Sequence, residues 1–269
     1  MKTRAFAGAV LCIAVAGPVV AQTAGPITWV AYSLGKPGKT EDWLKTIMKY
    51  DAPLYDKLQS AGTIRSWGVA TPINHRPGMK WNLLTWATLD DWGAVEKWAG
   101  AAMQAMQARP AAEAKAVQAA SDASEETRTH FDEVVRNAYV STPAPGTKFA
   151  YFFVGHYVAR PGQDAAATQL YKDAVVPMGE KLMAEGVVAG FGLHVQELHG
   201  QFQPGGIVWT HRVWWAVPSL ASIDRIKAAQ VSMMTAENLK RSAEVFDMAT
   251  HWDDVLMVLH LGGTPPAAK

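Results

Sequence analysis

Three histidines and one arginine occupy matching positions on four strand-like segments in the second half of the chain: His156, His194, Arg212 and His260. Histidine moves protons near neutral pH, and arginine holds an anionic or developing negative oxygen. Side chains alternate between the two faces of a strand, so the spacing places all four on one face. We expect them to converge as catalytic groups.

The opposite register of the same segments is apolar, and we expect it to lie under helices. It holds Phe149, Tyr151, Phe153, Val187, Ala189, Phe191, Leu193, Val213, Trp215, Val255, Met257 and Leu259. We expect no carboxylate beside the inward-facing histidines, and therefore no metal site, because three histidines alone lack the acidic ligand of a facial triad.

The first half of the chain has uncharged residues at the four corresponding positions, namely Tyr32, Ala70, Leu84 and Tyr139. The titratable set therefore belongs to the second half alone. We expect the first half to complete a polar, neutral cavity wall, and aromatic rings to stack on an aromatic ligand. The expected substrate-binding residues are Tyr32, Asn82, Trp86, Tyr139 and Trp214.

Two further histidines lie directly before the last strand of each half. His130 and His251 each follow a threonine and precede an aspartate by two residues. This local context favours a capping or turn role over a functional one.

The first 21 residues are typical of a secretory signal peptide. Lys2 and Arg4 precede an apolar stretch that ends at Ala21, and Cys12, the single cysteine, lies within it. We expect a periplasmic or secreted protein, since no later stretch is long and apolar enough to span a membrane. The balance of 25 basic and 24 acidic residues argues against a nucleic-acid partner and against a membrane-surface role.

The remaining chain contains an internal similarity that indicates a duplication. Residues 37–75 align with 161–199 at a shift of 124, without a gap. Trp81 and Trp86 align with Trp209 and Trp214 at a shift of 128, and 129–134 aligns with 250–255 at a shift of 121. We expect one repeat over 22–142, a linker at 143–147, a second repeat over 148–262 and a disordered tail at 263–269.

Each repeat has the pattern of a ferredoxin-like βαββαβ unit. In the first, we expect strands at 27–35, 63–73, 79–89 and 133–140, a helix at 40–60 and a long helical region before the last strand. In the second, we expect strands at 148–159, 187–198, 207–217 and 254–261, with helices at 164–185 and 219–249.

A ferredoxin-like sheet covers one face with its helices and leaves the other bare, so we expect two repeats to close one α+β barrel. This layout resembles the dimeric α+β barrel superfamily in its fused two-repeat form, which includes EthD-like, NIPSNAP-like and chlorite-dismutase-like groups. The last resemblance implies a haem in the second repeat, with His199 as its proximal ligand and Arg212 on the distal side.

We therefore expect an exported protein that binds a small apolar or aromatic, partly anionic molecule in the barrel cavity. Conversion of this molecule by histidine acid–base chemistry is a further hypothesis that the sequence leaves open. No cofactor is required, and a homo-oligomer is compatible with the sequence. Two alternatives remain open: a haem-binding dismutase-like or peroxidase-like protein, and a non-catalytic sequestering or assembly protein.

Overall fold

A computed structural model describes residues 25–75, 79–126, 130–142, 147–198, 209–233 and 235–262. The expected signal peptide, the C-terminal tail, most of the expected linker and His199 lie outside these residues.

The first repeat (repeat 1) follows the expected order of elements. Its strands are β1 (Ile27–Ser33), β2 (Ser66–Pro72), β3 (Leu83–Leu89) and β4 (Phe131–Val140), and its helices are α1 (Thr40–Tyr50), α2 (Ala52–Ser60), α3 (Trp92–Ala108) and α4 (Ala111–Ser124). Pro53 opens α2, and Gly62 follows it at φ 73°, a conformation that favours glycine. The Asp91 carboxylate caps α3 by accepting a hydrogen bond from the Ala94 amide.

The second repeat (repeat 2) has the same order. Its strands are β5 (Tyr151–Tyr157), β6 (Gly190–Leu198), β7 (His211–Val217) and β8 (Trp252–Leu261). Its helical segments are α5 (Asp164–Leu170), the π-helix η2 (Tyr171–Val175), α6 (Val176–Ala184), α7 (Ala221–Met233), α8 (Ala236–Val245) and the short 3-10 helix η3 (Met248–Thr250). The expected restart near Pro177 is observed as a change of helix type, because η2 passes directly into α6 at Val176 and Pro177 lies in the first turn of α6.

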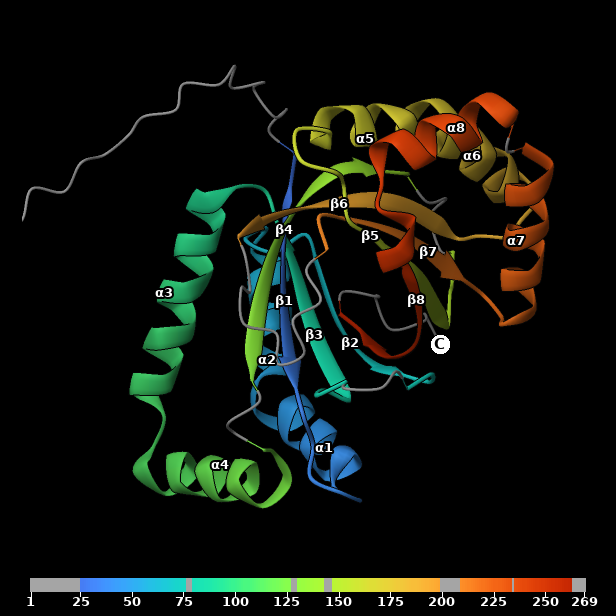
Figure 1. The fold of residues 1–269 in the computed structure, drawn as a ribbon. Helices are drawn as coiled ribbons and strands as arrows, with labels where there is room; N and C mark the ends of the chain where they lie inside the picture. The colour runs from blue at the N-terminus through green and yellow to red at the C-terminus, as the bar shows by residue number, and fades with distance from the viewer. Residues whose placement is uncertain are drawn as a thin grey trace, which may run out of the picture.

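The eight strands close into one antiparallel barrel in the order β1-β3-β2-β8-β5-β7-β6-β4 (Figure 1). The ladders β2–β8 and β4–β6 join the two repeats. The predicted α+β barrel of two ferredoxin-like repeats is therefore confirmed. No helix in the described part of the chain has the length and apolar character that crossing a membrane requires.

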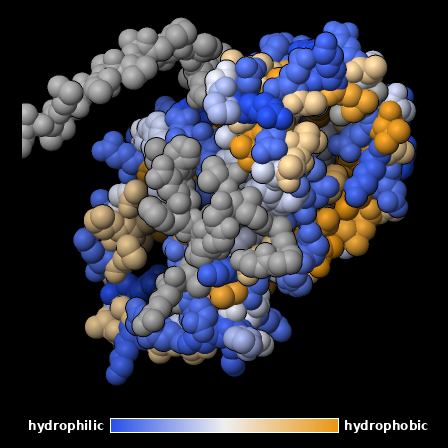
Figure 2. Space-filling view, in the orientation of Figure 1, coloured by the Kyte–Doolittle hydropathy of each residue, from blue (hydrophilic) through white to orange (hydrophobic). Residues whose placement is uncertain are grey.

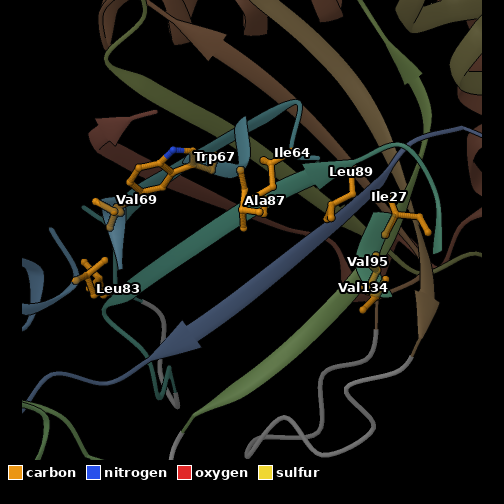
Figure 3. Packing of buried hydrophobic residues seen from close by; sticks show 12 residues of the cluster. Ile27, Ile64, Trp67, Val69, Leu83, Ala87, Leu89, Val95 and Val134 are labelled. Atoms are coloured by element: carbon orange, nitrogen blue, oxygen red, sulfur yellow. The ribbon is translucent and has the colours of Figure 1, made fainter. Parts of the chain in front are cut away.

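Helices cover the outer face of each half of the barrel. In repeat 1, Trp67, Leu83 and Leu89 of the strands pack with Ile47, Leu58 and Val95 of the helices. Figure 3 shows the three strand residues and Val95 within this cluster. In repeat 2, the expected outward register is confirmed for Phe153, Phe191, Leu193 and Trp215, which pack with helix residues of the same apolar cluster: Tyr171, Met178, Leu182 and Ile226. Two other members of the register differ, because Met257 is 37% exposed and Leu259 packs against the repeat 1 cluster. A separate cluster fills the middle of the barrel with side chains of both repeats: Val30, Tyr32, Ala70, Trp81, Leu84, Val154 and Leu256.

Two β-bulges change which side chains face the interior. The β4–β6 ladder leaves Ala138 without a strand partner, and the β2–β8 ladder leaves Leu259 without one. The two positions correspond at the shift of 121 residues. Each extra residue rotates the next side chain to the other face of the sheet. Tyr139 and His260, which follow the bulges, therefore lie on the helix-covered side, and their expected inward orientation is wrong.

Candidate functional site

Arg212 is the centre of a buried polar network inside one end of the barrel. Its Nη1 donates to the Tyr32 hydroxyl at 2.9 Å and to Glu133 Oε2 at 3.3 Å. Its Nε and Nη2 lie 3.3 and 3.2 Å from His194 Nδ1, and its guanidinium lies 4.7 Å from the centre of the Trp209 ring. The structure thus brings Arg212, His194 and Tyr32 together, as expected.

Two buried carboxylates share this interior, which corrects the expectation that none would. Glu133 is 1% exposed and accepts hydrogen bonds from the Tyr32 hydroxyl at 2.8 Å and from the Trp209 indole at 3.0 Å. Asp254 is 2% exposed and accepts from the Trp252 indole at 3.3 Å. They occupy corresponding positions in the two repeats, and strand alternation alone could have revealed both.

His156 and His194 lie inside the barrel in different surroundings. His156 stacks on Trp252 at 4.7 Å, and its Nδ1 lies 3.7 Å from Asp254 Oδ2. His194 is held beside Arg212, where burial and the neighbouring guanidinium lower its pKa well below the usual histidine value. His194 therefore stays neutral and accepts a hydrogen bond, and the two histidines do not form a matched catalytic pair.

Three expected site residues do not reach this network. His260 packs against Trp67 at 4.6 Å on the outer side of repeat 1, and Tyr139 packs against Phe191 at 5.4 Å on the outer side of repeat 2. Asn82 braces the loop after β1, because its amide bonds the backbone of Gly35 in both directions. The expected interior positions of His260 and Tyr139 are therefore wrong, whereas substrate binding by Asn82 stays a prediction.

The two expected stacking tryptophans do face the barrel interior. Trp86 meets Phe152 edge-on at 5.4 Å, and Trp214 meets the same ring at 6.0 Å. Both belong to the interior apolar cluster. Their rings contact other side chains of the protein, as expected for core residues.

Among the described residues, the members of the polar network bond to one another. The Arg212 side chain is 7% exposed and the Glu133 side chain is completely buried, so the pair is shielded from water. Burial alone would lower the pKa of Arg212, but the interactions with Tyr32 and Glu133 outweigh this effect and raise the pKa. Among the described residues, no group of three or more His, Cys, Asp or Glu is placed to hold a metal. The network thus links side chains of both repeats at one end of the barrel.

A cavity of about 260 Å³ lies elsewhere, between the outer face of the repeat 1 sheet and helices α2 and α3. Its floor follows the strand register: Asp132, Ala31 and Thr85 pair across β4, β1 and β3, and Ala87 pairs with Trp29 in the next row. The residues that line it are Trp29, Ala31, Tyr55, Thr85, Trp86, Ala87, Trp98, His130 and Asp132.

The corresponding region of repeat 2 contains larger side chains. Trp215, 1% exposed, stands at the position of Ala87, and it packs at 5.4 Å against Phe191. The isolated β-bridges Gly35–Glu125 and Ala159–Phe246 identify Phe246 as the counterpart of Glu125. The cavity of repeat 1 thus lies where small or acidic residues replace the aromatic rings of repeat 2.

The polar side of the cavity is built around His130. Its Nε2 lies 3.4 Å from Asp132 Oδ1 and its Nδ1 lies 3.7 Å from Glu125 Oε1. The neighbouring Asp132 and Glu125 carboxylates stabilise the protonated imidazole and raise the pKa of His130 to about 10. Burial alone would raise the pKa of Asp132, but hydrogen bonds from His130 and Trp29 outweigh it and lower the pKa.

His130 is the residue that the sequence interpretation missed. The sequence indicates a local turn role, and its partners Glu125 and Asp132 are indeed close in the chain, but its place in the wall of an aromatic cavity is not predicted. The difference between Ala87 and Trp215 at corresponding positions could have drawn attention to this region, because a small residue opposite a large one marks unequal volumes in the two repeats.

The repeat 2 residues do not fit a haem. On the outer face of its sheet, Tyr171, Phe191 and Trp215 pack together with at most 3% exposure. On the inner face, Arg212 is bonded to Glu133 and Tyr32. The described residues therefore form no haem pocket on either face of the repeat 2 sheet. His199 lies outside the described part of the chain.

Comparisons with known proteins support the fold. No protein-family model matches the chain, and no curated protein is significantly similar to it. Its structure is similar to a protein from Fusobacterium nucleatum that is described as a proposed monooxygenase (12% identity, TM-score 0.57, covering 89% of this chain and 95% of that one). It is also similar to an anthrone oxidase-like protein (11% identity, TM-score 0.51, covering 91% and 97%).

A further similar structure is a haem-binding protein from Thermus thermophilus, at 14% identity and a TM-score of 0.48, with 88% and 92% of the two chains covered. These likenesses are at the level of the fold. The fold that the chain shares with the first two of these proteins is, in this chain, a single barrel closed by two ferredoxin-like repeats.

Proposed function

We propose that this protein binds a small, largely apolar molecule of aromatic size in the repeat 1 cavity. The observation that carries the proposal is a space of about 260 Å³ walled by Trp29, Tyr55 and Trp98 and floored by small residues. Ligand sites are concave and mostly apolar with a few placed polar groups, and this volume suits a molecule smaller than a typical drug.

Proton transfer at this cavity would involve His130. With a pKa near 10 it is cationic at neutral pH, so it could donate a proton but could not serve as a base. An acid of this strength is weak at neutral pH, so the geometry supports binding more strongly than conversion. In either role, the ligand contacts repeat 1 rather than the histidines of repeat 2.

Titration with phenol and indole tests the binding proposal. We expect saturable binding by calorimetry together with a change in tryptophan fluorescence. Ala87→Trp, which introduces the residue found in repeat 2, should abolish both signals by filling the cavity. Ala119→Trp adds the same ring at an exposed position of α4 and should bind as the natural protein does. Equal binding by both variants would contradict the proposal.

We also propose that the chain is exported and cleaved after Ala21. The support is the charged and apolar pattern of residues 1–21. N-terminal sequencing of the protein recovered from its host should begin at Gln22, and recovery of a chain that keeps residues 1–21 would contradict export with cleavage.

A further inference from the structure

The charge around the repeat 1 cavity is negative, although a guanidinium and several histidines lie elsewhere in the barrel. Asp132 and Glu125 flank a single protonated His130, which leaves one uncompensated negative charge. No lysine or arginine occurs among the described residues that line the cavity. An anionic ligand would therefore meet two carboxylates that are offset by one imidazolium, so the local charge opposes its binding.

The aromatic rings of the cavity form a continuous wall. The Trp29 and Trp98 ring centres are 5.4 Å apart with planes inclined by 56°, and the Tyr55 and Trp98 centres are 6.3 Å apart with planes inclined by 54°. All three rings line the cavity. The electron-rich faces of tryptophan and tyrosine attract organic cations, most strongly where water is excluded.

We infer that the ligand of this cavity is a small organic cation, with an alkylated ammonium group placed between the aromatic wall of Trp29, Tyr55 and Trp98 and the carboxylate of Asp132. This inference rests on the proposed function and names its ligand class. The positive charge of the ammonium group would attract the Asp132 carboxylate, and its methyl groups would pack against the aromatic rings. A neutral molecule of the same shape would use the rings alone.

Repeat 2 provides an internal comparison for the acidic group. Asp253 corresponds to Asp132, and its carboxylate lies 3.3 Å from His251. There, however, the histidine stacks on Tyr157 at 4.4 Å, and Tyr157 in turn packs on Phe246 at 5.2 Å. Aromatic rings thus occupy the place of the second carboxylate and of the open space. The same histidine–aspartate pair is present in both repeats, but only repeat 1 combines it with Glu125 and a described cavity.

Three probes of nearly the same shape and different charge test the inference: choline, 3,3-dimethylbutan-1-ol and 3,3-dimethylbutanoate. Calorimetry on the full chain at neutral pH should show choline binding about tenfold more tightly than the neutral alcohol, the difference expected for one cation–aromatic contact with a nearby carboxylate. The carboxylate probe should show no saturable binding.

Asp132→Asn and Glu125→Gln should each reduce the preference for choline over the alcohol several-fold and leave the affinity for the alcohol nearly unchanged. Asp253→Asn is the matched control, and it should keep the full preference. A preference lost equally in Asp253→Asn would contradict the assignment to repeat 1.

Two other outcomes separate this inference from the proposed function. If the neutral alcohol binds as tightly as choline and Ala87→Trp abolishes both, the cavity binds small molecules and the cationic class is wrong. If Ala87→Trp changes the affinity for none of the three probes, for phenol or for indole, both the inference and the proposed function are wrong.

Discussion

Arg212 owes its position to partners on both repeats. It reaches from β7 to Tyr32 on β1 and Glu133 on β4. A buried ion pair contributes little net stability when it is intact, because desolvation offsets the attraction, but removing one member leaves an isolated buried charge. The network therefore favours one arrangement of the two repeats over others.

Arg212→Leu, which introduces the residue found at Leu84 in repeat 1, tests this role. We expect the free energy of unfolding to fall by about 3–5 kcal/mol, because Glu133 is left buried without its cation. The double variant Arg212→Leu with Glu133→Gln should recover part of this loss. Urea unfolding followed by circular dichroism measures both, and a loss below about 1 kcal/mol in the single variant would contradict the buried pair.

His130 makes stability depend on pH. Its pKa is raised from 6.5 to about 10 in the folded chain, so its contribution is complete below pH 6.5 and disappears as the pH rises through 10. The melting temperature of the natural protein should therefore exceed that of His130→Gln at pH 6, and the difference should shrink towards pH 10.5. Thermal melts across this range measure it. A difference that grows with pH would show that His130 is not held as a cation.

At the scale of elements, the two helix layers are packed differently. In repeat 2, α6 approaches β6 closely at Gly179, where a Cβ atom would lie 2.5 Å from the Phe191 ring. In repeat 1, α3 stands beside the barrel (Figure 1), and Val95 is its one buried residue among those described. The looser layer of repeat 1 is the one that contains the cavity.

Two glycine-to-alanine changes distinguish these layers. Gly179→Ala should lower the free energy of unfolding by about 1–3 kcal/mol, because the added methyl group overlaps Phe191. Gly100→Ala in α3 meets nothing within 4 Å and should raise it by about 0.5–1 kcal/mol through helix propensity. Chemical denaturation measures both changes. Equal effects of the same sign would contradict the difference in packing.

At the scale of the whole molecule, each repeat supplies the cover for the other. The interior apolar cluster combines Val30 and Leu84 of repeat 1 with Val154 and Leu256 of repeat 2. Most of the coloured residues in Figure 2 are polar, while apolar residues gather at the edge where α7 lies. Val231 of α7 is 81% exposed. A homo-oligomer remains a prediction.

Splitting the chain within 143–147 tests this mutual dependence. Two halves expressed together should co-purify in a 1:1 ratio, because the ladders β2–β8 and β4–β6 and the shared interior hold them together. Either half alone should self-associate or precipitate, since its sheet leaves an apolar face uncovered. Light scattering after size-exclusion chromatography measures the stoichiometry. A half that stays monomeric and folded would contradict the shared core.

Local patterns in the sequence determined the order of strands and helices, the outward face of repeat 2 and the closure into a barrel. Alternation on strands and helical spacing are properties of neighbouring residues, so they can be read without knowing which segments pair. The same alternation placed Tyr32, His156, His194 and Arg212 inside the barrel.

Tertiary structure alone decided the rest. The bulges at Ala138 and Leu259 arise only where strands of different repeats pair, and they turned Tyr139 and His260 outward. The cavity depends on the volumes that meet across a sheet and its helices, with Ala87 in one repeat and Trp215 in the other. Strand pairing and side-chain packing join residues that are far apart in the chain. A local sequence pattern therefore does not predict which of the two sheet-and-helix layers contains a cavity.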